Sequence, residues 1–291
     1  MAIAPVPLAQ AIATHVADGA CLALEGFTHA IPFAAGHEII RQRRRDLHLV
    51  RMTPDLVYDQ MIGMGCARAL TFSWGGNPGV GSAHRLRDAV ENGWPGRLAL
   101  CEHSHAGLAA AYVAGASRLP FGLLRGYLGT DLPGVNDAVR SVICPFTGEA
   151  LAAVRAVNPD VTILHAPCAD RDGNVLLRGI TGAQKEAALA ARKLIVTVER
   201  LVERLDAPLN AVVLPHWVVT AIAVVPGGAH PSYVQGCYER DNAFYQAWDG
   251  ISRERDSFQR WMERYVLGSA DHGEFLRALA ADGVVRLEAR A

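Results

Sequence analysis

The residues with the clearest capacity for chemistry form the run Glu102-His103-Ser104-His105. A serine beside histidines can act as a nucleophile once a neighbouring imidazole takes its proton. However, the chain has no Gly-x-Ser-x-Gly elbow, and no acid stands at a spacing known to orient the base. Ser104 also suits the N-cap of the helix expected directly after it, and both interpretations stay open.

A second candidate lies in the stretch 21–33, where an apolar run ends at Gly26 and Pro32 precedes a helical pattern. This order predicts a strand, a loop and a helix. In an open α/β sheet such loops bind ligands, because N–H groups and the positive end of the next helix meet there. Gly26 allows close backbone approach, so the loop could hold an anion or an oxyanion; alternatively, Gly26 and Pro32 only turn the chain.

The same order occurs again at 69–91, where a glycine-rich loop at 74–82 follows an expected strand and precedes an expected helix. No Gly-Lys-Ser/Thr follows the loop, and it lacks the dinucleotide fingerprint, so it does not predict nucleotide binding. It is either a substrate-side loop or a simple connection.

Composition excludes several classes of protein. Of 291 residues, 51% are hydrophobic and 20% are charged, which is typical of a globular chain. The 28 basic residues against 29 acidic ones give no electrostatic reason to bind nucleic acid or an anionic membrane. The six cysteines are scattered without zinc-site spacing, and no apolar run reaches membrane-spanning length. We therefore expect a cytoplasmic protein without a metal site.

The elements that must position these residues alternate between strands and helices. This alternation predicts one α/β domain over 1–291, with a largely parallel sheet flanked by helices and a helical C-terminal segment. The aromatic residues of that last segment stand at helical intervals and are expected in the core. Strands are expected at 21–24, 47–52, 69–73, 161–166, 194–198, 212–214 and 218–225, and helices at 8–17, 33–45, 58–62, 84–91, 106–116, 182–192 and from 242 onward.

Several runs together resemble the α chain of glutaconate CoA-transferase and its class I CoA-transferase relatives. The likeness covers nearly the whole chain, and the Gly-Ala-His-Pro-Ser stretch followed by Tyr, Asp-Asn and Phe is its most specific part. The runs are Leu24-Glu25-Gly26-Phe27-Thr28, Pro32-Phe33-Ala34-Ala35, Met61-Ile62-Gly63, Leu119-Pro120-Phe121, Asp172-Gly173-Asn174, 227–232 and 238–244.

The resemblance implies a CoA-transferase α/β fold in a two-subunit enzyme, usually an α2β2 heterotetramer. It implies coenzyme A as a substrate, no tightly bound cofactor, and a glutamate nucleophile on the β subunit. That glutamate attacks an acyl-CoA thioester, becomes a glutamyl-CoA thioester, and passes CoA to a second carboxylic acid.

The resemblance also implies roles for residues of this chain. Gly26 and Phe27 stand in the loop whose N–H groups face the thioester carbonyl, where each oxyanion forms. Arg125, His103 and His105 could bind a substrate carboxylate, although Arg125 could equally close a surface ion pair. The residues expected to bind substrate are Thr28, Gly76, Asn77, Gly79, Ser104, His105 and Arg125.

The run Glu91-Asn92-Gly93 mimics the nucleophile motif of the β subunit. It ends a predicted helix, whereas the family nucleophile follows a strand, and Asn-Gly is an ordinary helix C-terminal signal. We therefore predict that Glu91 is a solvated helix end rather than the nucleophile.

Two departures from the family pattern make glutaconate itself doubtful as the substrate. Glu25 stands where many relatives have a glycine, and Pro78 replaces a serine, so that hydroxyl and N–H are both lost. A second branch, the α subunit of an actinobacterial steroid ring-cleaving CoA hydrolase, shares the arginine that Arg125 matches. In that branch a glutamate acts near the position of His105.

Three functions therefore remain open from the sequence. The first is a CoA-transferase α subunit, the second is a hydrolase α subunit, and the third is a binding protein that kept the fold and lost the chemistry. A neighbouring gene would separate them, since a β-type chain with a strand-borne Glu-Asn-Gly favours the transferase. A β-type chain without that glutamate favours the hydrolase, and no such neighbour favours the binding protein.

Overall fold

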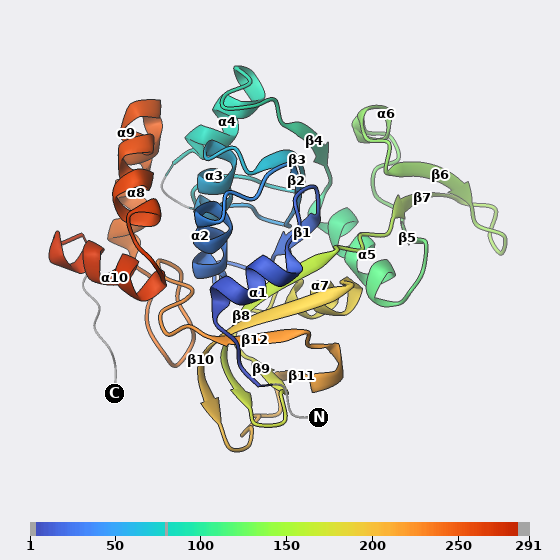
Figure 1. Ribbon diagram of the computed structural model, residues 1–291. Helices are drawn as coiled ribbons and strands as arrows, with labels where there is room; N and C mark the ends of the chain where they lie inside the picture. The colour runs from blue at the N-terminus through green and yellow to red at the C-terminus, as the bar shows by residue number, and fades with distance from the viewer. Residues whose placement is uncertain (1–3, 79–80, 285–291) are drawn as a thin grey trace.

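The computed structural model describes residues 4–78 and 81–284. A nine-stranded sheet forms its centre (Figure 1). Parallel pairing runs through β4-β3-β2-β1-β8-β10-β12, and β9 and β11 add an antiparallel extension on β8. These strands are β1 (Cys21–Leu24), β2 (Leu47–Val50), β3 (Ala67–Phe72), β4 (Ala99–Glu102), β8 (Val161–Asp170), β9 (Val175–Leu177), β10 (Lys193–Val202), β11 (Val212–Leu214) and β12 (Ala221–Val224).

Helices cover both faces of this sheet. Successive residues of β1 point to opposite faces, so Leu22 and Leu24 join one apolar core while Ala23 joins another. The first core is packed by α1 (Leu8–His15), α2 (Phe33–Arg41), α3 (Leu56–Gly63) and α4 (His84–Glu91), and the second by α5 (His105–Ala116) and α7 (Gln184–Ala190). The predicted α/β fold with a largely parallel sheet flanked by helices is thus confirmed.

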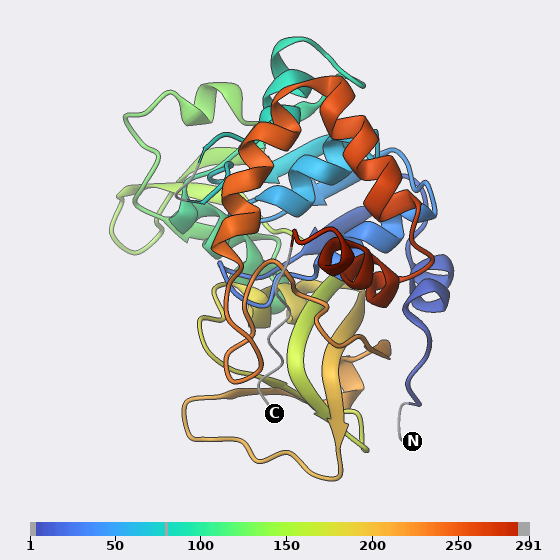
Figure 2. The same ribbon diagram turned by 90° about the vertical axis from the view of Figure 1, so that its left-hand side faces the viewer.

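The C-terminal segment is helical, as predicted, and lies over α2 and α3 (Figure 2). It comprises α8 (Asn242–Arg253), α9 (Arg255–Trp261), a π-helical turn (Met262–Leu267) and α10 (His272–Ala281). Phe244, Trp248 and Phe258 are buried, which confirms that these aromatics belong to the core. Trp248 Nε1 donates to Asp59 Oδ2 of α3 at 3.0 Å, so the segment is also tied by a polar contact to the helices that cover the sheet.

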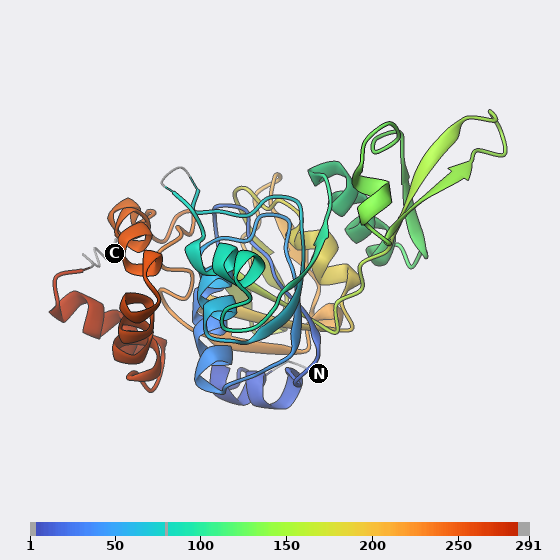
Figure 3. The ribbon, with the colours of Figure 1, turned by 90° about the horizontal axis from the view of Figure 1, so that it is seen from above.

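A second, antiparallel sheet was not expected from the sequence. Its strands pair in the order β5-β7-β6, and it projects away from the main sheet (Figure 3). We call residues 121–155 the arm; it contains β5 (Phe121–Leu124), α6 (Leu132–Val135), β6 (Val139–Ile143) and β7 (Ala150–Arg155). Phe121, Leu123 and Ile143 of the arm are exposed. Apolar residues therefore do not mark the buried face of its strands, and the sequence carries no clear strand signal there.

Several predicted element bounds need correction. The strand expected at 194–198 continues through the charged residues to Val202, because β8 pairs with it along its whole length. The run expected as a strand from 218 begins as a 3₁₀ turn at His216–Val218, and β12 starts only at Ala221. The first strand and the helix at 84–91 have the predicted bounds.

Candidate functional site

A cavity of about 370 Å³ lies where parallel strands of the main sheet end. It is lined by residues that follow four neighbouring strands: Phe27 and Thr28 after β1, Arg51, Thr53 and Asp55 after β2, Trp74 and Pro78 after β3, and His105 after β4. The carboxyl ends of parallel strands meet at one edge of a sheet, and ligands bind at that edge in open α/β folds. The sheet therefore brings together loops that are far apart in the sequence.

The loop after β1 is backbone-strained at the cavity. Thr28 has φ 58° and Ala30 has φ 49°, a region that side chains with a Cβ rarely adopt. Two contacts hold it, one with the last residue of the Gly-Ala-His-Pro-Ser segment and one with the residue after it, since Ile31 N donates to Ser232 Oγ at 3.1 Å and Ala30 N to Tyr233 O at 2.9 Å. The segment that carries the family likeness therefore supports the loop that opens onto the cavity.

A glycine is needed at position 26 because the backbone of the same loop passes close to its Cα. A Cβ at this position would lie 2.7 Å from His29 O, 2.9 Å from Ala30 O and 2.9 Å from Ile31 Cα. These are backbone atoms, so no side-chain movement could make room. Gly26 thus allows the loop to turn tightly on itself, and its close approach to a ligand stays a prediction.

Two backbone donors at the cavity are unused within the chain. In the described residues, neither the Phe27 nor the Thr28 N–H has a hydrogen-bond acceptor, although both residues border the cavity. Backbone N–H groups near a binding site are suited to stabilise a developing oxyanion. Within the part of the chain that the structure describes, Phe27 and Thr28 therefore offer unpaired backbone donors beside the cavity, while the oxyanion role expected of Gly26 and Phe27 stays a prediction.

A buried polar cluster lies beneath this loop. Arg51, fully buried, donates from Nη1 to Asp55 Oδ1 at 2.9 Å and from Nη2 to Gly26 O at 2.7 Å. Glu25 Oε1 accepts from Met52 N at 3.2 Å and from Tyr112 Oη at 2.8 Å. Burial raises the pKa of the Glu25 carboxyl, against the opposing effect of Arg51. Glu25, which stands where many relatives have a glycine, thus points inward and links the loop after β1 to the loop after β2.

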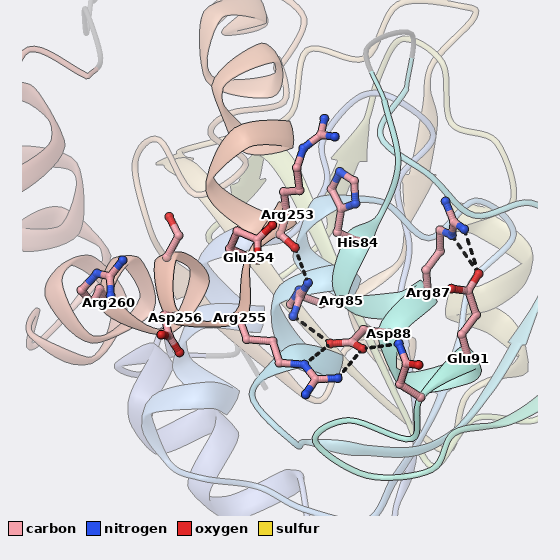
Figure 4. A pocket seen from close by; sticks show the side chains of 12 residues that line it. His84, Arg85, Arg87, Asp88, Glu91, Arg253, Glu254, Arg255, Asp256 and Arg260 are labelled. Atoms are coloured by element: carbon pink, nitrogen blue, oxygen red, sulfur yellow. Dashed lines mark hydrogen bonds and ion pairs between the residues drawn. The ribbon is translucent and has the colours of Figure 1, made fainter.

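A larger cavity of about 740 Å³ lies between α4 and the beginning of α9 (Figure 4). Several arginines border it, and those other than Arg260 are hydrogen-bonded to acids of the chain. Arg255 donates to both oxygens of Asp88 at 2.7 Å, Arg85 donates to Asp88 Oδ2 at 2.9 Å, and Arg87 donates to Glu91 Oε1 at 2.9 Å. The hydrogen bond from Arg255 holds the pKa of Asp88 at about 2. This arrangement has the character of a structural ion-pair network.

Some predicted site residues lie at the smaller cavity and others do not. Phe27, Thr28 and His105 border it. Ser104 caps α5, where its Oγ accepts from Gly107 N at 3.0 Å, as one of the two interpretations predicted. Arg125 lies in the arm and donates from Nε to Glu149 Oε1 at 2.8 Å with its side chain 79% exposed, so it forms the alternative surface ion pair and is not brought to this cavity.

The glycine-rich loop after β3 mainly packs. Gly76 lies against the Trp74 ring, where a Cβ would come within 3.0 Å, and Asn77 Nδ2 donates to Tyr245 O at 2.7 Å. Gly79 lies outside the described residues. Glu91 ends α4 with its side chain 54% exposed and pairs with Arg87, which agrees with a solvated helix end.

Sequence reasoning missed Arg51, Thr53 and Asp55. A usable signal existed, because all three directly follow β2 (Leu47–Val50) and so stand at the carboxyl end of a strand. Among the described residues, no three His, Cys, Asp or Glu side chains are grouped in a way that could hold a metal ion. Over the same residues, no helix has the length and apolar character needed to span a bilayer.

Comparison with known proteins agrees with this geometry. Residues 7–224 match the family model described as Coenzyme A transferase. The chain is 64% identical to the A-type subunit of 3-oxoadipate CoA-transferase from Pseudomonas knackmussii, over 94% of this chain and 97% of that protein. The glutaconate coenzyme A-transferase structure from Acidaminococcus fermentans superposes with a TM-score of 0.90 at 30% identity, covering 98% of this chain and 95% of that one. A cholesterol ring-cleaving hydrolase subunit from Rhodococcus jostii is 29% identical over 60% of this chain and 63% of that protein.

Proposed function

This chain belongs to the coenzyme A transferase family, and from that premise we propose that it is the A-type subunit of a 3-oxoadipate CoA-transferase. Its reaction moves CoA from an acyl-CoA to a carboxylic acid, and the nucleophile is a glutamate of a B-type subunit. The relative at 64% identity supports 3-oxoadipate as one of the acids.

One observation carries this proposal most directly. Phe27 and Thr28 border the cavity at the strand ends, and their N–H groups have no acceptor within the described chain. A thioester carbonyl placed there would find donors for the negative charge that develops on its oxygen. One such donor changes the rate by a factor of about a hundred to a thousand in enzymes that form an oxyanion.

The reaction is balanced without a redox or metal step. The partner's carboxylate attacks the acyl-CoA carbonyl, the C–S bond of the tetrahedral adduct breaks, and CoA leaves as a thiolate while an acyl-glutamyl anhydride forms. The thiolate then attacks the glutamyl carbonyl and releases the first acid as a carboxylate. The second acid takes the CoA by the same two steps in reverse. Each attack forms an oxyanion, so the loop is used in every step.

The nucleophile must come from another chain. Asp55 is the carboxylate among the described residues that border the cavity, and Arg51 binds it from the interior. Glu91 faces solvent at the end of α4 and borders the larger cavity instead. A B-type subunit that covers the cavity would supply the missing glutamate, and we propose an α2β2 assembly in the cytoplasm in which residues 1–291 form one domain.

The test is co-expression with a B-type chain of the same family. We expect CoA transfer between 3-oxoadipate and a panel of acyl-CoA thioesters by the complex, and none by this chain alone. Hydroxylamine or borohydride trapping should label the partner's glutamate after incubation with acyl-CoA. Robust turnover by the isolated chain would overturn the placement of the nucleophile and return attention to Glu91 and Ser104.

The same assay separates the hydrolase alternative, which the Rhodococcus jostii relative favours, although His105 stands at the cavity where that branch has a glutamate. A ring-cleaving hydrolase would act on a CoA thioester without a second acid, by addition of water. A transferase requires the acceptor acid for steady turnover. Product formation that is independent of any added acid would therefore decide for the hydrolase.

A further inference from the structure

Two consecutive residues of the loop after β1 are hydrogen-bonded to two consecutive residues of the loop after β2. Gly26 O accepts from Arg51 Nη2 at 2.7 Å, and the Glu25 side chain accepts from Met52 N at 3.2 Å. We call these four residues the clasp. The strained backbone at Thr28 lies just beyond the clasp, so the clasp is placed to hold that conformation against relaxation.

The Arg51 contact fixes the direction of one particular N–H. Gly26 O and the Phe27 N–H belong to the same peptide unit, which is planar and trans. Its oxygen and its N–H therefore point to opposite sides. Once Arg51 holds the oxygen, the peptide can no longer rotate, and the Phe27 N–H is held on the side away from the guanidinium.

The same contact strengthens that N–H as a donor. A hydrogen bond from a charged group to a carbonyl is stronger than a neutral one, and it polarises the peptide so that its N–H donates better. Arg51 is fully buried and its guanidinium is itself held by Asp55 at 2.9 Å, while the centre of the Tyr58 ring lies 5.5 Å from its Cζ. The cation is thus fixed in place before any substrate binds.

We propose that Arg51 is a positioning residue for CoA transfer, which orients and polarises the Phe27 N–H through the Gly26 carbonyl. The role rests on the proposed function, because it needs an oxyanion at the loop. It predicts that Arg51 affects the chemical steps more than substrate binding. A merely structural Arg51 would affect stability and leave the rate of the folded complex unchanged.

The test removes the cation without leaving an unpaired buried charge. Replacing a buried ion pair by apolar residues of similar volume often preserves stability, whereas removing one partner does not. In the complex with the B-type subunit, the double variant Arg51→Met/Asp55→Leu should keep its assembly and melting temperature near the parent's. We expect kcat to fall about a hundredfold, the scale of one oxyanion donor, and KM to change less than about threefold.

Two further variants keep the proposal falsifiable. Arg85→Met/Asp88→Leu removes a comparable buried pair at the larger cavity and should leave kcat within about twofold of the parent. Arg51→Ala opens space beside the smaller cavity, and added guanidinium at millimolar concentration should restore part of the lost rate. Parental kcat in the folded Arg51→Met/Asp55→Leu complex would overturn the role of Arg51. Absence of CoA transfer in the parent complex would instead overturn the proposed function.

Discussion

The larger and the smaller cavity described above differ in which of their polar groups remain without a hydrogen-bond partner among the residues that the structure describes. The larger one is bordered mostly by arginines that the chain's own carboxylates bind, as Asp88 binds Arg255 and Arg85. The smaller one is bordered by Phe27 and Thr28, whose N–H groups have no acceptor in the described chain. Volume and charge density therefore favour the larger cavity as the binding site, whereas unpaired hydrogen-bond donors favour the smaller cavity.

The carboxyl groups near the two cavities also differ, in the direction of their pKa shifts. The hydrogen bond from Arg255 lowers the pKa of Asp88 to about 2, whereas burial raises the pKa of Glu25. A lowered pKa marks an anion that is stabilised in the folded state, and a raised pKa marks one that folding penalises. Perturbation by burial near a binding cavity is characteristic of functional sites, while a fully paired ion-pair network is typical of structural ones.

The largest effect is expected at Gly26. In Gly26→Ala the new Cβ would lie 2.7 to 2.9 Å from three backbone atoms of the same loop, so the loop must shift. We expect kcat/KM of the complex for CoA transfer to fall about a hundredfold. Gly250→Ala is the matched control, because a Cβ there meets no atom within 4 Å. An assembled Gly26→Ala complex with parental kcat/KM would remove the functional distinction between the two cavities.

A second effect concerns the pH dependence of stability at Glu25. Since its folded pKa lies above the ordinary 4.5, its contribution to the free energy of unfolding is greatest below pH 4.5 and declines as pH rises through the folded value. Gln keeps the acceptor for Met52 N and Tyr112 Oη but cannot ionise. Melting temperatures from about pH 4 to 8 should therefore shift in favour of Glu25→Gln as pH rises. A difference that is constant with pH would contradict the raised pKa.

The contribution of Asp88 to stability should depend on pH in the opposite direction, and its replacement should have little effect on catalysis. Its contribution to stability is fully present above the ordinary pKa of 3.8 and is lost as pH falls through about 2. Asp88→Asn should cost about 2 kcal/mol at neutral pH, the scale of a hydrogen bond to a charged group. Chemical denaturation should show this deficit shrinking below pH 3.8, while kcat at neutral pH stays within about twofold. A large loss of kcat with the complex intact would make the larger cavity part of the active site.

The smallest effect is expected at Glu91. Its exposed side chain pairs with Arg87 on the helix surface, a contact worth about 0.3 to 0.5 kcal/mol. Glu91→Ala should therefore leave kcat of the complex nearly unchanged, whereas deletion of a covalent nucleophile costs several orders of magnitude. Steady-state kinetics of the assembled variant decide between these outcomes, and a loss of about a hundredfold would identify Glu91 as the nucleophile.

Much of the fold could be predicted because its signals are local. The apolar run Cys21–Leu24 followed by Gly26 is a strand with its loop, and the pattern at His84–Glu91 is a helix with the predicted ends. The arm could not be predicted in this way. Phe121 and Leu123 are exposed on one face of β5 while Gly122 and Leu124 are half-buried, so no clear contrast of hydrophobicity marks the strand.

The candidate site was predictable only in part. Phe27, Thr28 and His105 carry family motifs and do lie at the cavity. Arg125 was chosen on the same kind of signal, but its guanidinium lies on Glu149 in the arm. Arg51 and Asp55 belong to no motif that we used. Their importance follows from their burial, and the spacing of an arginine and an acid four residues apart does not predict burial.

The sequence by itself determined the family, the alternation of strands and helices, and the loop that opens onto the site, because each depends on residue order within a short segment. Only the tertiary structure decided which polar groups are already paired and which are free. That decision depends on partners far apart in the chain, as with Arg51 and Gly26, or Glu25 and Tyr112. Parallel pairing of β1, β2, β3 and β4 brings their ends to one edge, and the cavity forms where those four loops converge.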